Sequence, residues 1–486
     1  MFKNLIVKEP LSLSFMKYFL FSLLWICIIH FTSGQILKQA SWQQKVDYDI
    51  KVRLIDSNNT LEGSSIITYS NNSPDTLKEL YIHLWTNAYR DNQTPFAKQQ
   101  VRTKNTKFYY SKEEDKGNVQ VVFAEGGNEV KPNYIKDDQE IAILKLAKPI
   151  LPGQSRNVET TFKVKLPKEF SRMGSGENSY GAKDYQITQW FPKVAMYDVN
   201  GWHPFNYLDL GEFYDNFGDY KVSITVPSQY MVAATGEMQF NKKELEWRRD
   251  TRGVSNVVRE GDGTLKTLVF EQENVHDFAW FASNAFKEYQ DSVKLESGNV
   301  IQTYFYSTHE DEGSMEALKN ALKFYSSELG DYPYKACSVV EGALSAGGGM
   351  EYPMITVISY MTDRVIVHEV GHNWFQGILG TNERRYPWMD EGVNSYYENL
   401  YFKRLPKGNS KTGIIPKLLE DSEEAQSYFI CRHQHNLNET QACGLHSDDY
   451  TELNYGGIIY GKVALMFEYL KTDLGEDLFT KCMKEY

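Results

Sequence analysis

Two histidines and a glutamate lie close together in the second half of the chain. Residues 368 to 372 read His-Glu-Val-Gly-His, so His368 and His372 are four positions apart, with Glu369 beside the first. Apolar residues flank this motif on both sides, which favours a helix. Because residues i and i+4 share one helical face, both imidazoles can reach one metal ion. The spacing therefore predicts a metal site.

A carboxylate further along the chain can complete this site. The pattern is typical of zinc metalloproteases, and catalytic zinc takes three protein ligands and a water. Glu391 stands in the sequence Trp-Met-Asp-Glu-Gly, and Glu398 lies seven residues later on the same helical face. We predict one zinc ion held by His368, His372 and Glu391. Glu398 either accepts an N–H from a ligand imidazole or is a solvated carboxylate, and the two histidines could also be structural.

These motifs resemble those of the gluzincin zinc aminopeptidases, the family of aminopeptidase N and leukotriene hydrolase. That family has His-Glu-x-x-His, eighteen residues and then Glu, as found here from His368 to Glu391. Residues 347–353 read Gly-Gly-Gly-Met-Glu-Tyr-Pro and resemble its Gly-x-Met-Glu-Asn motif, with Tyr in place of Asn. The resemblance implies that Glu351 binds the substrate α-amino group. The adjacent Gly348 and Gly349 would let the substrate backbone approach.

A tyrosine motif extends the resemblance towards the end of the chain. Tyr460 begins the sequence Tyr-Gly-Lys-Val-Ala, which is similar to the Tyr-x-Lys-Gly-Ala stretch of the family. The resemblance implies that Tyr460 stabilises the tetrahedral oxyanion, although Tyr455 lies nearby and could compete for this role. In the first half, residues 188–192 resemble the region that supplies a substrate-contacting glutamine, which here is Gln189.

Together these residues predict a zinc-dependent metallopeptidase. Glu369 would act as the general base, and Glu351 would direct cleavage to the first residue, so we expect an aminopeptidase that acts on peptides with a free N-terminus. Two alternatives remain open. One is a zinc endopeptidase with the same metal site, and the other is a non-catalytic relative that binds peptides.

The spacing of apolar residues differs between the two halves of the chain. Apolar and charged residues alternate over 46–54 and again over 220–226, which is typical of strands with one solvated face. Later, apolar residues recur with helical spacing over 314–329. We therefore predict a multidomain α+β chain. It would have a β-sandwich-like N-terminal domain at 35–287, and the family resemblance implies that 288–486 form a thermolysin-like α/β catalytic domain.

The resemblance also implies a helical C-terminal domain after the catalytic one. The chain stops inside the amphipathic pattern that begins near residue 458, with no cap or helix-breaking signal at that end. We accordingly expect that the catalytic domain is truncated at its C-terminus and that the helical domain is missing.

The first residues have the composition of an export signal. A basic Lys17 precedes a short apolar run at 18–31, and small residues follow. This arrangement predicts a signal peptide at 1–34, whether translation begins at Met1 or Met16. The protein would be exported to a periplasmic or extracellular location, with no stable membrane span after cleavage. An uncleaved signal-anchor is the alternative.

Charge and cysteine content add two further expectations. The chain has 52 Lys and Arg against 64 Asp and Glu, a net charge of −12. An acidic surface repels phosphate backbones, so we expect no nucleic-acid partner. In an oxidising compartment Cys431 and Cys443 could form a disulfide, although free thiols and a metal site are alternatives.

Overall fold

The computed structural model describes residues 42–486 except 136–137, 179–180, 212, 252–257, 312, 343–347, 360–361 and 406–422. The predicted signal peptide lies outside the described residues, and so does Gly347. Residues from Gln43 to Tyr486 form one compact unit. Within the described part of the chain, no helix is both long enough and apolar enough to cross a membrane.

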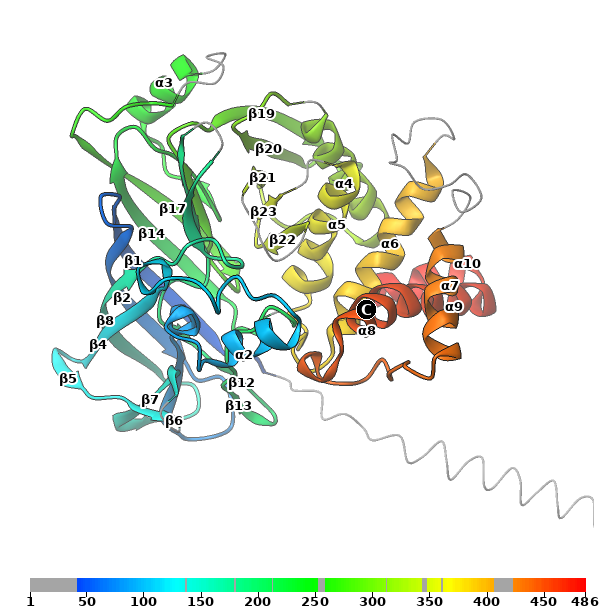
Figure 1. Ribbon diagram of the computed structural model, residues 1–486, viewed down its shortest axis with the longest axis horizontal. Coiled ribbons are helices and arrows are strands. Elements are labelled where there is room, and N and C mark those ends of the chain that lie inside the picture. Colours follow the sequence, from blue (N-terminus) through cyan, green and yellow to red (C-terminus); the bar gives the residue numbers. More distant parts are fainter. Residues whose placement is uncertain are drawn as a thin grey trace, which may run out of the picture. The chain divides into compact units, whose positions relative to one another are not determined.

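A mixed eight-stranded sheet makes up much of the first half (Figure 1). Its strands, in order across the sheet, are β16 (Glu237–Met238), β17 (Leu265–Val275), β14 (Gly218–Pro227), β1 (Lys45–Ile55), β2 (Thr60–Ser70), β8 (Ser155–Lys165), β4 (Asn118–Glu125) and β5 (Asn128–Val130). The alternation predicted in two segments is confirmed in β1 and β14, which pair in parallel. In both strands every second side chain is buried, because one face of the sheet covers the core.

Smaller sheets complete the first half. One has the order β15 (Met231–Ala234), β18 (Trp280–Ser283), β10 (Lys183–Ile187) and β9 (Gly174–Glu177). Another has the order β11 (Lys193–Val194), β3 (Leu77–His83), β7 (Asp138–Ile150) and β6 (Asn133–Ile135). β12 (Met196–Asp198) and β13 (Gly201–His203) form a hairpin, and two helices, α2 (Pro95–Arg102) and α3 (Lys242–Thr251), lie outside the sheets.

The second half combines a five-stranded sheet with helices. The sheet order is β19 (Lys287–Lys294), β20 (Val300–Ser307), β21 (Ala336–Glu341), β23 (Ile355–Ile358) and β22 (Gly349–Tyr352). β22 is therefore an edge strand, and it is antiparallel to β23. The helices are α4 (Ser314–Leu329), α5 (Asp363–His372), α6 (Glu391–Arg404), α7 (Glu423–Asn436), α8 (Glu452–Asn454), α9 (Val463–Leu474) and α10 (Glu476–Glu485).

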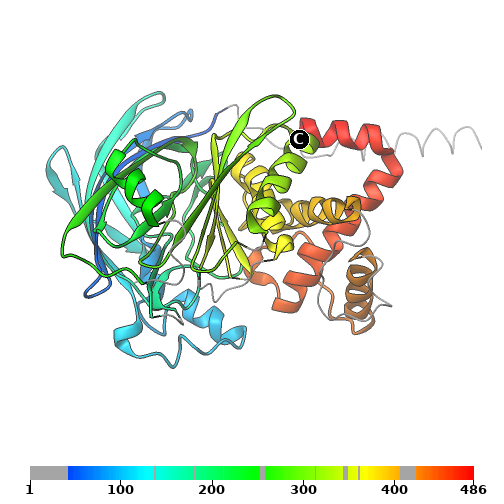
Figure 2. The ribbon, with the colours of Figure 1, turned by 90° about the horizontal axis from the view of Figure 1, so that it is seen from above.

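Helix α5 occupies a central position in this half. It packs against β22 and β23 on one side and against α4 and α6 on others, and α6 packs in turn against α9 (Figures 1 and 2). A connected hydrophobic core runs from β1 through the five-stranded sheet to α5 and α6. The expected multidomain α+β architecture is thus present in outline, whereas the domain boundaries and the missing helical domain remain predictions.

The cysteines differ from one of the sequence expectations. All four described cysteines, including Cys431 and Cys443, are free thiols. Cys431 instead places its Sγ 3.5 Å from the carbonyl oxygen of Gly457.

Candidate metal centre and active site

Helix α5 presents the two predicted histidines on one face. Its first turn is capped by Thr362, whose side chain accepts a hydrogen bond from the backbone N–H of Val365. One turn separates His368 from His372, and their Nε2 atoms lie 3.1 Å apart. The i and i+4 spacing therefore brings both imidazoles to one point, as the sequence predicted.

Glu391, the first residue of α6, supplies a third atom at this point. Its Oε2 lies 3.2 Å from Nε2 of His368 and 3.4 Å from Nε2 of His372. A tetrahedral zinc ion with bonds of roughly 2.0–2.1 Å requires its ligand atoms to be about 3.3 Å apart. The three side chains therefore fit one face of a zinc tetrahedron without rearrangement.

Close contact between α5 and α6 produces this convergence. Gly371 has no side chain, and a Cβ there would lie 2.1 Å from Oδ1 of Asn394 on α6. The amide nitrogen of Asn394 donates to the backbone carbonyl of His368 at 2.8 Å. The glycine inside the His-Glu-Val-Gly-His motif thus lets α6 approach, which places Glu391 opposite the histidines.

Each imidazole also has a carboxylate on its other nitrogen. Nδ1 of His368 lies 2.9 Å from Oε2 of Glu398, and Nδ1 of His372 lies 2.5 Å from Oδ1 of Asp390. A carboxylate that accepts the Nδ1 proton leaves Nε2 unprotonated and fixes the orientation of the ring. Glu398 has the contact that the sequence suggested. The contact of Asp390 was not predicted from the sequence. Its position next to the predicted ligand Glu391 could have indicated that it lies near the histidines.

The carboxylates give this centre a negative electrostatic character. Burial lowers the pKa of His368, but its hydrogen bonds to Glu391 and Glu398 outweigh burial and raise the pKa to about 10. Burial raises the pKa of Glu391, but the two imidazoles outweigh it and hold that pKa well below its usual range. The surroundings therefore favour a positive charge between these side chains, as a cation would supply.

Glu369 and Glu351 lie beside the three converging side chains. Glu369, Glu351 and His372 each place one candidate ligand atom within 4.8 Å of the others. Both carboxylates are buried, and Glu351 comes from the edge strand β22. Gly349 of the same strand makes room for Glu369, since a Cβ there would lie 2.5 Å from Oε1 of Glu369. By contrast, a Cβ at Gly348 would make only ordinary contact with Val365.

Tyr460 reaches the same centre from a π-helix, Tyr455–Lys462. Its hydroxyl donates to Oε1 of Glu391, and its ring stacks on His368 with centroids 5.9 Å apart. Gly392 permits this approach, because a Cβ there would lie 2.4 Å from Val463. Tyr455 packs within a small apolar cluster that Tyr460 only borders, so the geometry favours Tyr460 as the tyrosine at the centre.

Comparison with known proteins agrees with this arrangement. Residues 313–486 match the sequence profile of the peptidase family M1 domain. The matched stretch contains His368, His372, Glu391 and Tyr460. The resemblance to the family of aminopeptidase N and leukotriene hydrolase is thereby confirmed.

Individual relatives match this chain over short stretches. Aminopeptidase Q of Homo sapiens is 28% identical over 136 residues, which are 27% of this chain and 12% of that protein. Aminopeptidase Q of Mus musculus is 27% identical over 127 residues, 25% of this chain and 21% of that protein. The alignments thus span less than a quarter of either relative.

Solved structures match over most of the chain. An M1 zinc metallopeptidase from Deinococcus radiodurans is 16% identical, with a TM-score of 0.59 over 91% of this chain and 86% of that one. A mutant of that protein bound to Tyr-Ser-Ala is 15% identical, with the same TM-score and the same coverage. At this identity the likeness shows a shared fold.

One sequence candidate from the first half also reaches the M1 domain. Gln189 follows β10 in a left-handed conformation, with φ of +47°. Its amide nitrogen lies 3.3 Å from the hydroxyl of Tyr352, next to Glu351. The structure thus brings Gln189 to Tyr352 of β22, and among the described residues it makes no hydrogen bond to the three converging side chains.

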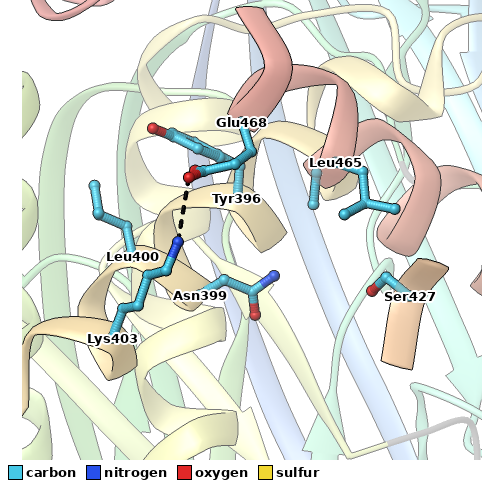
Figure 3. A pocket seen from close by; sticks show the side chains of 8 residues that line it. Tyr396, Asn399, Leu400, Lys403, Ser427, Leu465 and Glu468 are labelled. Atoms are coloured by element: carbon cyan, nitrogen blue, oxygen red, sulfur yellow. Dashed lines mark hydrogen bonds and ion pairs between the residues drawn. The ribbon is translucent and has the colours of Figure 1, made fainter. Parts of the chain in front are cut away.

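A small cavity elsewhere in the M1 domain is too small for a peptide. It holds about 10 Å³ and lies between α6 and α9, where Lys403 and Glu468 form an ion pair of 3.2 Å (Figure 3). Its lining consists of Tyr396, Asn399, Leu400, Lys403, Ser427, Ala464, Leu465 and Glu468. This volume fits about one water molecule.

Proposed function

We propose that the protein is a zinc-dependent metallopeptidase, with one zinc ion held by His368, His372 and Glu391. The observation that carries the proposal is the separation of the three ligand atoms by 3.1 to 3.4 Å. Imidazoles with a carboxylate behind each ring are typical of zinc ligands. The match of residues 313–486 to the peptidase family M1 domain supports the same assignment.

The neighbouring side chains fit the hydrolysis of an amide bond. Zinc, when bound, supplies an activated water and polarises the substrate carbonyl. Glu369 would take the proton of that water and pass it to the leaving amine. The hydroxyl of Tyr460 would donate a hydrogen bond to the developing oxyanion, a contribution of about 3 kcal/mol in comparable sites.

We further propose that the enzyme is an aminopeptidase. The Glu351 carboxylate, close to both Glu369 and His372, is suited to bind the ammonium group of a peptide N-terminus. An extended peptide could pair with β22, which is the edge strand of its sheet. The names of the Aminopeptidase Q relatives and the Tyr-Ser-Ala complex of the Deinococcus radiodurans protein support this substrate class.

Metal content and cleavage assays test both proposals. The purified chain should contain about one zinc per molecule and should cleave an aminoacyl reporter until a chelator removes the metal. Blocking the peptide N-terminus should abolish cleavage. Equal cleavage of blocked and free peptides would instead establish an endopeptidase. Zinc without cleavage of either substrate would leave the peptide-binding alternative.

A further inference from the structure

A cavity of about 550 Å³ lies between the two halves of the chain. The first half lines it with α2 and with residues of the segment 204–208, and the second half lines it with Arg384, His446 and Asp448. No residue of the candidate metal centre is among the described residues of its lining. Small-molecule sites typically have volumes of about 300–1,000 Å³. The cavity is therefore large enough for a small organic ligand, and the proposed hydrolysis does not use it.

Positive side chains predominate around this cavity. Lys98, Arg102 and Arg384 are cations, and Asp448 is the only carboxylate among the described lining residues, which leaves a formal charge of +2. The whole chain has a net charge of −12, so this positive excess is local. A cavity lined by one sign of charge concentrates ions of the opposite sign. The lining therefore favours an anion.

Helix α2 supplies two of the cations. Arg102 donates through Nη2 to Oδ1 of Asp448, which also accepts from Nε2 of Gln99 at 3.0 Å. Lys98 lies one turn before Arg102 on the helix, and its side chain makes no hydrogen bond or ion pair with a described residue. Because Asp448 is shared by Arg102 and Gln99, it does not neutralise Lys98. The ammonium group of Lys98 is thus available to a ligand.

The second half supplies a guanidinium and an imidazole. Arg384 is buried, its Nη1 donates to the carbonyl of Leu210 at 3.2 Å, and its guanidinium lies 4.8 Å from the ring centroid of Phe205. Burial lowers the pKa of His446, so its ring is neutral at pH 7. Nδ1 of that ring accepts the backbone N–H of Asp448 at 3.2 Å, which leaves the ring proton on Nε2. A fixed guanidinium and an N–H donor both suit a phosphate group.

The rest of the lining is largely apolar. Phe205 and Leu208 line the cavity together with Pro95 and Pro204. The ring of Phe205 stacks on that of Trp85 with centroids 5.7 Å apart, and Nε1 of Trp85 donates to the carbonyl oxygen of Phe205 at 3.0 Å. These contacts hold the ring in place, so a ligand gains apolar contact without ordering a mobile side chain. The cavity thus combines a cationic part with a rigid apolar part.

We propose that this cavity binds a small organic phosphate. Lys98, Arg102 and Arg384 hold the phosphate group. Phe205 and Leu208 contact the apolar part of the ligand. A phosphate monoester has a charge of about −1.5 to −2 at pH 7, which matches the charge of +2 on the lining, whereas a carboxylate has a single charge. Because the ligand contacts both halves of the chain, its binding should also raise the temperature of unfolding.

Calorimetric titration with phenyl phosphate tests the proposal. We expect one site per chain with a Kd of about 1 mM or tighter. Inorganic phosphate lacks the apolar part, benzyl alcohol lacks the charge and phenylacetate has one charge, so each should bind at least about tenfold more weakly. Absence of saturable binding of phenyl phosphate, or equally tight binding of phenylacetate, would overturn the proposal.

A zinc-free chain separates this cavity from the metal centre, because a phosphate can also bind a metal ion. Removal of zinc by a chelator should leave the Kd for phenyl phosphate unchanged. Loss of binding with the metal would place the phosphate at the metal centre and overturn the proposal. A chain that binds phenyl phosphate as expected but never contains zinc would reject the proposed function and leave this inference in place.

Two matched charge reversals locate the site. Lys98→Glu reverses a charge in the cavity and should weaken phenyl phosphate binding by about tenfold or more. Lys107→Glu makes the same change of net charge at an exposed residue outside the lining, and its Kd should change by less than about twofold. Thermal unfolding without ligand checks that both variants fold. An unchanged Kd in Lys98→Glu, or equal weakening in the two variants, would overturn the proposal.

Discussion

The two metal-facing histidines occupy the same helix but different surroundings. The side chain of His368 is 15% exposed, and its partner Glu398 also binds Arg364, whose side chain is 37% exposed. The side chains of His372 and Asp390 are both fully buried. A lost partner can be replaced by water on the exposed side but not on the buried side. The buried side should therefore contribute more to the rigidity of the centre.

The two sides also differ in which elements supply the carboxylate partners of the histidines. Glu398 lies two turns along α6 from Glu391, so one helix supplies a ligand and the partner of the other ligand. Asp390 stands just before α6, and the turn that precedes it packs against the first half, where Arg384 donates to the carbonyl of Leu210. The buried side thus depends on tertiary packing, and the exposed side on helix geometry.

The largest expected effect concerns Glu369, the proposed general base, which belongs to neither of the two histidine–carboxylate pairs. We expect Glu369→Gln to lower kcat by about 10²- to 10⁴-fold, because the amide cannot take a proton. Zinc content should stay near that of the unsubstituted chain, since the three ligands are unchanged. Metal analysis and steady-state kinetics on the same preparation check this, and activity within threefold would contradict the assignment of the base.

A second effect separates substrate stabilisation from metal binding on the exposed side. Tyr460→Phe removes the hydroxyl that contacts Glu391 but keeps the ring against His368. We expect kcat to fall by about 10²- to 10³-fold with KM little changed, as when one oxyanion donor is removed. Tyr455→Phe is the matched control and should retain activity. A larger loss in the control would transfer the role to Tyr455.

Replacing the two carboxylate partners tests the comparison directly. Asp390→Ala should weaken zinc affinity by about 10- to 100-fold, and Glu398→Ala by a smaller factor, because water can reach the ring of His368. Competition with a chelator of known affinity measures both. The reverse order would show that burial does not decide which partner matters more.

The sequence predicted the parts of this site that follow from regular spacing. His368, His372 and Glu398 were found because helix periodicity alone places them on shared faces. The roles of Gly371 and Asp390 escaped notice, since they depend on how α6 and the turn before it pack against α5. In the first half, alternation predicted β1 and β14 as strands. Their parallel pairing joins segments about 170 residues apart, and nothing local in either strand specifies that partner.

The smallest expected effect lies at the outer end of the exposed pair. Arg364 forms an ion pair with Glu398, but its side chain is 37% exposed. Exposed ion pairs contribute little because water screens them, so we expect Arg364→Gln to change zinc affinity by less than about threefold. Chelator competition at low and high salt checks this. If Arg364→Gln weakens zinc binding as much as Asp390→Ala does, water does not replace a lost partner on the exposed side. The proposed difference between the surroundings of His368 and His372 would then be rejected.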